Sequence, residues 1–340
     1  MLRKVLTIAG TSIGEHTSPY VIAEVGSNFN QNLDTAKRLI DVAAAAKANA
    51  VKFQLFRASL LYPNGGELHD IFKSIELNPD WVPDLAKHAA DQGVHFMASA
   101  FDMESVDVLE AVNAPAHKIA SSETTNLAFV HYVASTGKPV VISTGMCDMV
   151  DVEEAVNVCL GVGNQQVILL QCGAMYPLPP DLANLRVVAA FANRFSCPVG
   201  FSDHTLGQIA AVAAVGLGAT VFEKHFTLDR KSKGPDHFYA LEPEELKSYV
   251  AVIHEAHKSL GSAKKEMLPK ERELGRREGI YVVRAMSAGE RIGKGDVSVK
   301  RPALGLRARY ASSIVGAVLT RPIEKDQPLT WDMLSFRSKQ

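Results

Sequence analysis

Polar and charged side chains recur in this sequence where short apolar segments end. Three pairs of them, Lys52/Gln54, Ser202/His204 and Glu223/His225, are spaced by two residues. In an extended strand this spacing places both members of a pair on the same side. The residues found at successive segment ends are Glu24, Lys52, Gln54, Ser99, Lys118, Ser121, Glu123, Ser143, Tyr176, Ser202, His204, Glu223 and His225. Their recurrence predicts strands whose ends meet at one chemical site.

Lys52 and Lys118 differ from ordinary surface lysines, because each lies inside an apolar run of the sequence. An unpaired charge would be costly in such surroundings. Two lysines together with several hydroxyl groups make a local anion site that suits a phosphate. A lone lysine at the end of one strand would more often be a surface cation.

His204 and His225 follow what should be neighbouring strands, so their imidazoles can reach one point. Two imidazoles fit a divalent transition metal such as Mn²⁺, with a glutamate or water completing the shell. Hydrogen-bonded structural histidines are an equal alternative on spacing alone. His237 follows Gly-Pro-Asp, and we expect it on a loop as a substrate contact and not as a metal ligand.

The elements that would position these residues alternate between strands and helices. Amphipathic stretches such as Leu33–Ala48 separate the apolar runs and predict helices. The expected strands are Val21–Val25, Ala50–Phe53, His95–Ala98, Ala116–Ile119, Val140–Ser143, Val167–Gln171, Val199–Phe201 and Val221–Lys224. Eight such units fit a (β/α)₈ TIM barrel of roughly 250 residues, with its reactive groups at the carboxyl ends of the strands. A doubly wound open sheet is the alternative, but no G-x-G-x-x-G motif follows the first strand.

The composition changes after Gly261, and we predict three parts: a barrel over residues 1–261, a charged linker over 262–278 and a small β-rich domain over 279–340. The small domain contains an internal repeat, in which Val283–Ile292 resembles Thr320–Leu329. Two copies of one short unit suggest a compact, pseudo-symmetric domain that binds or covers a substrate.

The bulk composition excludes several classes of protein. Hydrophobic residues make up 47% and charged residues 21% of the sequence, and the formal net charge is -1. This composition is globular and lacks the field that would recruit nucleic acid or an anionic membrane. No apolar run has the length of a signal h-region or a membrane span, and the four cysteines form no C-x-x-C pair. We therefore expect a cytoplasmic protein with reduced thiols.

Seven segments, taken in order, resemble the signature blocks of the sialic acid synthase family. They are Ile22–Asn28, Val51–Gln54, Lys118–Ser121, Ile142–Met146, Gly200–Thr205, Glu223–Asp229 and Gly234–His237. Residues 279–336, with Lys300-Arg301-Pro302 at their middle, resemble the antifreeze-like (SAF) domain that ends those enzymes. The resemblance extends over nearly the whole chain, which makes it more specific than any single motif.

The resemblance implies a TIM barrel with a SAF domain, a domain-swapped homodimer, and a divalent metal held by His204 and His225. The metal would be Mn²⁺, with Mg²⁺ or Co²⁺ as alternatives. The residues implied to bind phosphoenolpyruvate are Lys52, Ser99, Lys118, Ser121, Ser143 and Ser202. Those implied to meet the sugar are Glu24, Gln54, Tyr176, Asp236 and, from the partner subunit, Arg301. Glu123 would lie close to the reacting carbons.

The implied enzyme is a transferase that joins phosphoenolpyruvate to the open-chain aldehyde of an acylamino sugar and releases phosphate. The sugar would be N-acetylmannosamine or a related 2,4-diacetamido sugar, and the product a nonulosonic acid. A metal acting as a Lewis acid would polarise the aldehyde, and C3 of phosphoenolpyruvate would attack it. Water would then add at C2, with Glu123 or Glu24 as the base, and the resulting hemiketal phosphate would lose phosphate.

Some positions depart from the usual family pattern, namely Phe29, Gln31–Asn32 and Ala174. Ala174 cannot supply the hydrogen bond to phosphate that a polar residue would make there. These departures leave the sugar open among N-acetylneuraminate, legionaminate and related synthases. Outside the family, the alternatives are a Schiff-base pyruvate aldolase on the same barrel and a non-catalytic sugar- or phosphate-binding protein. The latter would leave His204 and His225 unexplained.

Overall fold

The structure is a computed structural model that describes residues 1–336, and the chain divides into two compact units. The first unit is Met1–Gly261, and the second begins at Ser262. The boundary residue Gly261 ends the last helix of the first unit with a φ of 55°, which is a left-handed conformation that glycine adopts without strain.

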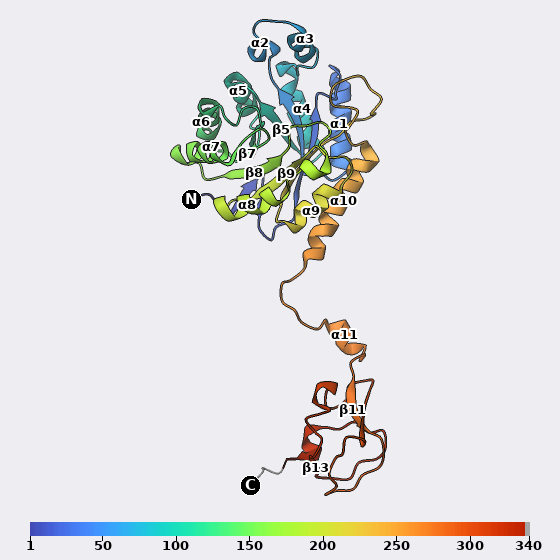
Figure 1. Ribbon diagram of the computed structural model, residues 1–340. Helices are drawn as coiled ribbons and strands as arrows, with labels where there is room; N and C mark the ends of the chain where they lie inside the picture. The colour runs from blue at the N-terminus through green and yellow to red at the C-terminus, as the bar shows by residue number, and fades with distance from the viewer. Residues whose placement is uncertain (337–340) are drawn as a thin grey trace. The chain divides into compact units, whose positions relative to one another are not determined.

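Eight parallel strands of the first unit close into a barrel (Figure 1). Each strand pairs with the next one in the chain, and the last, β10, pairs with β3. The strands are β3 (Tyr20–Gly26), β4 (Ala50–Leu55), β5 (His95–Ala100), β6 (His117–Ile119), β7 (Val140–Ser143), β8 (Val167–Cys172), β9 (Val199–Asp203) and β10 (Val221–His225). This arrangement confirms the predicted TIM barrel, and each predicted strand overlaps an observed one.

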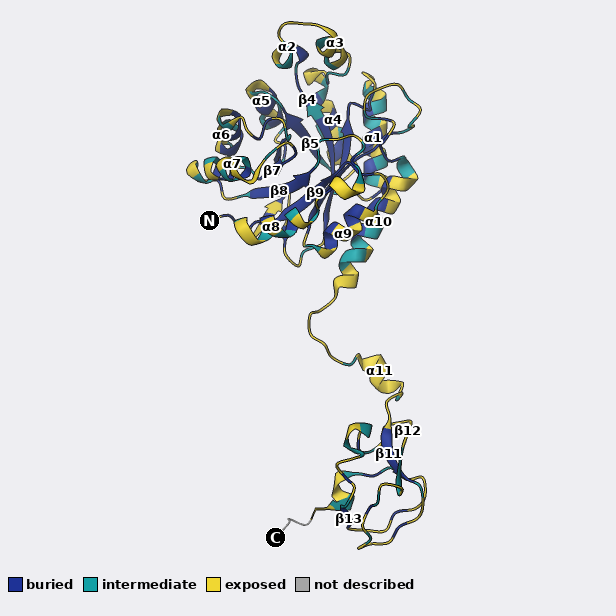
Figure 2. Cartoon of the chain, in the orientation of Figure 1, coloured by how far each residue is buried: buried dark blue, intermediate teal, exposed yellow. Residues whose placement is uncertain are grey.

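Helices cover the outside of the barrel, with their buried faces toward it and their exposed faces outward (Figure 2). They are α1 (Leu33–Ala45), α4 (Val82–Asp91), α5 (Met103–Ala111), α6 (Leu127–Ser135), α7 (Met149–Gly161), α8 (Arg186–Phe195), α9 (Ile209–Gly216) and α10 (Pro243–Leu260). Asn32, Asp102 and Asn126 cap three of these helices by accepting a hydrogen bond from a backbone N–H of the first turn. Within residues 1–336, none of the helices combines the length and the apolar character needed to cross a membrane.

The N-terminal hairpin, β1 (Val5–Ile8) and β2 (Thr11–Gly14), was not predicted from the sequence. Its buried side chains Leu6, Ile8 and Ile13 belong to an apolar cluster inside the barrel. The barrel strands contribute Tyr20, Ile22, Ala50, Met97, Ala116, Val141, Ile168, Leu170 and Val221 to the same cluster. The hairpin therefore helps to fill the amino end of the barrel.

A second unpredicted part is an insertion between β4 and α4. It contains α2 (Ala58–Leu61), α3 (Glu67–Lys73) and the short 3₁₀ turn η1 (Pro79–Trp81). Helices this short carry no sustained hydrophobic period, so their pattern could not be recognised in the sequence. The insertion follows the carboxyl end of β4, the end at which TIM barrels carry their sites.

Along six of the barrel strands, the inward-facing positions change from apolar to polar. Two residues after the apolar positions Ile22, Ala50, Met97, Ala116, Val141 and Val221 come Glu24, Lys52, Ser99, Lys118, Ser143 and Glu223. Residues two apart in a strand face the same side, so the second group forms a polar layer next to the apolar one. This layer lies at the carboxyl ends of the strands.

The second unit contains α11 (Pro269–Glu273), β11 (Gly279–Val282), β12 (Val297–Lys300), η3 (Ala308–Tyr310), β13 (Val318–Leu319), η4 (Trp331–Met333) and β14 (Leu334–Ser335). Equivalent positions of its two repeats bond to each other. The backbone N–H groups of Met286 and Ile323 each donate to the other's carbonyl oxygen at 2.9 Å. Ile292 and Leu329, the next equivalent pair, are both buried in the core of the unit. The repeat seen in the sequence is therefore a structural pseudo-symmetry.

Candidate active site

The strand register brings residues that are distant in the sequence next to one another around the carboxyl end of the barrel. Glu24 pairs in register with Lys52 on one side and with His225 on the other. Ser99 lies between Gln54 and Lys118, and Ser202 lies between Cys172 and Glu223. The polar layer is thus a continuous ring, and it lines a cavity of about 400 Å³. A volume of this order suits small molecules.

The centre of the site is a buried cluster of two lysines and two glutamates. The Nζ atom of Lys52 lies 2.5 Å from Glu24 Oε2 and 3.6 Å from Glu223 Oε2. Lys118 Nζ lies 3.9 Å from Glu223 Oε1. The side chains of all four are at most 6% exposed. Removing charges from water is costly unless they are paired, so each of these groups depends on the others.

The surroundings set the protonation of this cluster. Burial would raise the pKa of Glu223, but the two neighbouring lysines outweigh burial and hold it at about 2. Burial raises the pKa of Glu24 to about 8 in spite of Lys52. Burial lowers the pKa of Lys118 from its ordinary value. The two glutamates therefore differ in character, and Glu223 is the permanent carboxylate of the site.

Hydroxyl groups surround the lysines. Lys52 Nζ donates to Ser99 Oγ at 2.8 Å, and Ser202 Oγ donates to Glu223 Oε1 at 2.9 Å. Ser121 Oγ accepts from the backbone N–H of Gly145 at 2.9 Å. The Oγ atom of Ser143 is buried and has no hydrogen-bond partner in the described part of the chain. Buried polar atoms normally have partners, so this hydroxyl is available to a bound molecule.

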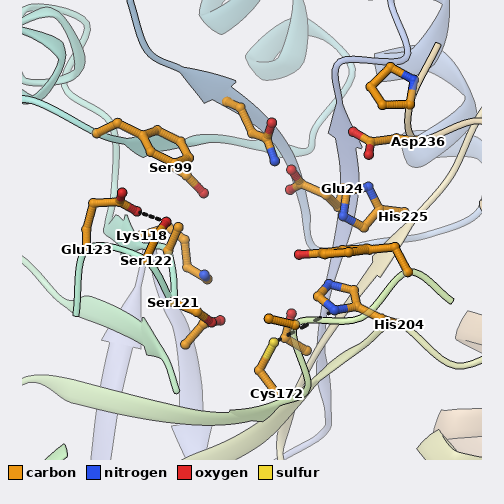
Figure 3. Close-up of a pocket in the computed structure, with 18 of the residues that line it drawn as sticks. Glu24, Ser99, Lys118, Ser121, Ser122, Glu123, Cys172, His204, His225 and Asp236 are labelled. Carbon is orange, nitrogen blue, oxygen red and sulfur yellow. Dashed lines mark hydrogen bonds between the residues drawn. The ribbon is translucent and has the colours of Figure 1, made fainter. Parts of the chain in front are cut away.

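His204 and His225 lie on the other side of the cavity, with ring centroids 5.6 Å apart (Figure 3). His204 Nδ1 is 2.8 Å from the carbonyl oxygen of Gly173, which fixes this ring nitrogen as the donor of that hydrogen bond and leaves Nε2 as the nitrogen that can bind a metal. His225 Nδ1 is buried and has no hydrogen-bond partner among residues 1–336. Burial lowers the pKa of His225 to about 4, so its imidazole is neutral.

A glycine at the end of β3 leaves room for the His225 ring. Gly26 has a φ of +55°, and a side chain there would meet Asp236 Oδ2 at 2.8 Å and the His225 ring at 3.1 Å. Asp236 accepts hydrogen bonds from Tyr239 at 2.9 Å and from Ser27 at 3.2 Å. The ring of Tyr176 packs against the imidazole of His204 in a tilted arrangement, with a centroid distance of 4.2 Å. The loop residues are therefore held against the two histidines.

Glu123 lies across the cavity from the histidines, beside Ser122 and Lys118 (Figure 3). Ser122 Oγ donates to Glu123 Oε2 at 2.7 Å. Burial raises the pKa of Glu123 to about 7, although the Ser122 hydroxyl and Lys118 both lower it. A carboxyl group with this pKa can take up and release a proton near neutral pH.

The structure gathers almost all of the predicted site residues into this one cavity. Those that line it are Glu24, Lys52, Gln54, Ser99, Lys118, Ser121, Glu123, Ser143, Tyr176, Ser202, His204, His225 and Asp236. Arg301 belongs to the second unit, where its side chain is 66% exposed and its Nε lies 3.6 Å from Glu278 Oε1. Within residues 1–336, no group of three or more His, Cys, Asp or Glu side chains has the arrangement of a metal site.

His237, which we expected to contact the substrate, and Phe29, which departs from the family pattern, both lie outside the cavity lining. His237 does not line the cavity, because its ring nitrogens contact Thr227 Oγ1 at 2.6 Å and Asn30 Oδ1 at 2.9 Å. Phe29 is buried and packs on Phe53 and Trp81, so the departure at this position concerns the core.

Glu223 and Cys172 line the cavity, but the sequence analysis gave neither of them a binding or catalytic role. Glu223 was paired with His225 by its spacing, but its position between two lysines depends on strands distant in the sequence. Cys172, one of four free thiols, was expected only to be buried, yet it lines the cavity. The only available signal was its place at the end of β8.

Known proteins with the same organisation cover nearly the whole chain. The N,N'-diacetyllegionaminic acid synthase of Legionella pneumophila is 35% identical over 341 residues, which cover 94% of this chain and 95% of that protein. The N-acetylneuraminate-9-phosphate synthase of Homo sapiens is 35% identical over 81% of this chain and 80% of its own length. A crystal structure of the N-acetylneuraminic acid (sialic acid) synthetase of Leptospira borgpetersenii, in complex with citrate, superposes with a TM-score of 0.76. That match is 31% identical and covers 80% of this chain and 95% of the other.

Sequence profiles of two families match the chain in the same order. The SAF domain profile matches residues 277–335, which lie in the second structural unit. The NeuB family profile matches residues 39–265, which include most of the barrel and the greater part of the cavity residues. The predicted relationship to the sialic acid synthases is therefore confirmed, and this chain belongs to the NeuB family.

Proposed function

We propose that this protein condenses phosphoenolpyruvate with the open-chain aldehyde of an acylamino sugar, giving a nonulosonic acid and phosphate. The observation that carries the proposal is that one cavity holds both a pair of lysines and a pair of histidines. Lys52 and Lys118, with their hydroxyl groups, form an anion site, and His204 and His225 lie across from it. The synthases among the relatives make products of this chemical type, which supports the same assignment here.

Phosphoenolpyruvate is assigned to the lysine side of the cavity. Two buried ammonium groups with adjacent serine hydroxyls suit a ligand that carries both a phosphate and a carboxylate. Ser143 Oγ, which is buried and has no hydrogen-bond partner within residues 1–336, adds a donor. Glu223 stays ionised between the lysines and favours the charged form of each, which supports an anion site.

His204 and His225 are assigned to a divalent metal ion of the Mn²⁺ type. The fit rests on the donor atoms: His204 Nδ1 is engaged by Gly173, so Nε2 is the nitrogen left to bind a metal, and His225 Nδ1 is buried without a hydrogen-bond partner among the described residues. Two imidazole ligands suit a first-row transition ion, whose remaining ligands would be water and substrate oxygens. When bound, such an ion acts as a Lewis acid that makes the sugar aldehyde more electrophilic.

The reaction forms one carbon–carbon bond and breaks the bond between C2 of phosphoenolpyruvate and the phosphate oxygen. C3 of phosphoenolpyruvate forms a bond to the aldehyde carbon, whose oxygen becomes a hydroxyl group. A water molecule adds its oxygen to C2, and Glu123 accepts the proton that this water loses. The phosphate then leaves C2 with its bonding electrons and takes the proton from Glu123, while the C2 hydroxyl releases its proton to the former aldehyde oxygen and becomes the keto group. The position of Glu123 beside Lys118 and the raised pKa of its carboxyl group support this role.

Glu24, Gln54, Tyr176 and Asp236 are assigned to the sugar, because they line the cavity on the side of His225 and the strand ends beside it. We further propose that the enzyme works as a homodimer in which Arg301 serves the site of the other subunit. Arg301 is largely exposed in its own unit, and its planar donor group suits the oxygen of an acylamino group.

The decisive assay is phosphate release from phosphoenolpyruvate in the presence of Mn²⁺ and a panel of acylamino hexoses. We expect release that depends on both the sugar and the metal. A Schiff-base aldolase would instead need no metal, and borohydride would trap pyruvate on a lysine. Trapping with pyruvate, or the absence of phosphate release with every sugar, would contradict the proposal.

A further inference from the structure

One wall of the cavity is apolar and comes from the insertion after β4. We call this surface the apolar wall. Its side chains are Leu61, Tyr62, Ile71, Phe72 and Ile75 from the insertion and Phe101 from the segment after β5. The insertion lies beyond the carboxyl end of β4, at one end of the barrel (Figure 1). The apolar wall therefore belongs to the outer part of the cavity, whereas the lysines belong to the strand ends at its base.

The apolar wall is held in place by packing. Phe56 is buried and contacts both Phe72 and Phe101 in edge-on arrangements, with ring centroids 5.4 and 5.6 Å away. Tyr62 packs on Phe72 with a centroid distance of 5.0 Å. Edge-on aromatic contacts of this kind add to the effect of burial. The wall is thus a surface supported from behind.

One hydrogen bond joins the two ends of the insertion, and another ties the insertion to the loop before α1. Glu76 accepts a hydrogen bond from the backbone N–H of Ala58 at 2.5 Å, and its carbonyl oxygen accepts one from the Gln31 side chain. Gln31 is one of the positions at which the sequence departs from the usual family pattern. In this chain it anchors the segment that carries the apolar wall.

The charges of the cavity disfavour a second phosphate group. Among the residues that line the cavity, four carry carboxyl groups, Glu24, Glu123, Glu223 and Asp236, and the lysines are Lys52 and Lys118. Both lysines already neighbour Glu223 at the base. Lys73 of the insertion pairs with Glu76 at 2.6 Å and is 64% exposed, and it is not a lining residue. A phosphate on the sugar would therefore face the apolar wall and carboxyl groups, and the lining residues offer it no lysine or arginine beyond the two at the base.

We infer that the sugar taken by this site is not phosphorylated and carries methyl-bearing groups at the end remote from its aldehyde. This inference rests on the proposed function, which places the aldehyde beside phosphoenolpyruvate at the base and extends the sugar outward. A deoxy carbon or a second acetamido group presents methyl hydrogens to the apolar wall, whereas hydroxyl groups there lose hydrogen bonds to water. A 2,4-diacetamido-2,4,6-trideoxymannose has both features, and N-acetylmannosamine has neither at that end.

The experiment compares three sugars with the full-length enzyme, phosphoenolpyruvate and Mn²⁺. They are 2,4-diacetamido-2,4,6-trideoxymannose, N-acetylmannosamine and N-acetylmannosamine 6-phosphate. We expect kcat/KM for the first to exceed that for the second by about tenfold or more, since methyl-sized groups in an apolar pocket discriminate to this degree. The phosphorylated sugar should be the poorest substrate.

A matched pair of variants tests the apolar wall itself. Ile71 and Leu68 are both exposed apolar residues of α3, but only Ile71 lines the cavity. Ile71→Asn should lower the ratio of kcat/KM for the diacetamido sugar over N-acetylmannosamine by about fourfold or more. Leu68→Asn introduces the same residue into the same helix and should leave the ratio unchanged.

The outcomes separate this inference from the proposed function. Equal or better use of N-acetylmannosamine or of its 6-phosphate by the wild type would overturn the inference and leave the proposed function in place. An unchanged ratio in Ile71→Asn would also overturn it. If none of the three sugars supports phosphate release, the proposed function fails, and the inference fails with it.

Discussion

The ammonium group of Lys224 lies 3.1 Å from the Oδ2 atom of Asp203, and the two side chains are 2% and 0% exposed. The pair joins β10 to β9 outside the cavity, and Tyr249 of α10 donates to the same Oδ2 at 3.1 Å. Asp203 Oδ1 accepts from the backbone N–H of Thr205 at 2.9 Å and from its hydroxyl at 2.7 Å. This network encloses His204, which lies between Asp203 and Thr205 in the chain.

The first prediction concerns this network. Lys224→Met leaves the Asp203 carboxylate buried without its cation and should lower the free energy of unfolding by about 3–5 kcal/mol. Tyr249→Phe removes one hydrogen bond and should cost about 1–2 kcal/mol. Urea denaturation measures both changes. Lys87→Met, which removes the exposed pair with Asp91 on α4, is the control and should leave the unfolding curve unchanged. A Lys224→Met protein as stable as wild type would show that the pair does not stabilise the barrel.

The second prediction concerns the metal. His204→Ala and His225→Ala should each abolish Mn²⁺ binding in titration calorimetry and abolish activity, because each removes one of two nitrogen ligands. The far-ultraviolet circular dichroism should stay near that of wild type, since a barrel does not need its metal to fold. EDTA should inactivate the wild type and Mn²⁺ restore it. His88→Ala, which alters a histidine paired with Asp41 on the outer helices, should retain binding. Full activity in metal-free wild type would contradict the assignment.

The third prediction concerns the anion site. Lys118→Met removes a positive charge 3.9 Å from Glu223 and should raise KM for phosphoenolpyruvate about 10–100-fold, with a smaller effect on KM for the sugar. Lys52→Met should act in the same direction. It should also destabilise the protein, because Glu24 and Glu223 then share a buried site without that cation. Lys138→Met, on the outside of the barrel, serves as the control in steady-state kinetics. A change confined to the KM for the sugar would mean that the lysines bind a different substrate.

The fourth prediction concerns pH. Glu123 acts as a base only when ionised, and its pKa is about 7, so kcat/KM should rise with pH through about 7. Glu123→Gln should lower kcat about 10²–10⁴-fold. Ser122→Ala removes a donor that favours the carboxylate, so the pKa of Glu123 should rise and the ascending limb should move to higher pH. The profile is recorded at saturating Mn²⁺ for wild type and Ser122→Ala. An ascending limb at the same pH in both proteins would exclude Glu123 as its source.

The fifth prediction places Arg301 in the site of the other subunit. His225→Ala and Arg301→Ala should each be inactive alone. After dissociation and reassociation of an equal mixture, half of the random dimers are mixed, and each mixed dimer has one intact site. Activity should recover to about a quarter of wild type. If Arg301 acts within its own chain, every site keeps one lesion and the mixture stays inactive.

The sequence by itself determined the barrel, the second repeat-containing domain and most of the candidate site. Alternation along a strand is a local property, so Lys52 and Gln54, or Glu223 and His225, were recognisable as pairs on the same side of a strand before any tertiary contact was known. The strand order followed from the regular alternation of strands and helices, because sequential units of this kind pack as neighbours. The small-domain repeat was equally visible, and its equivalent residues Met286 and Ile323 bond to each other.

Only the tertiary structure decided what each of these residues faces. Glu223 lies beside Lys52 and Lys118 because closure of the barrel brings strands together from distant parts of the sequence, and the resulting burial sets the pKa of each group. The apolar wall was also hidden, since α2 and α3 are too short to show a helical period. Charge pairing and cavity shape depend on distances across the fold, and a linear pattern carries only the spacing along one element.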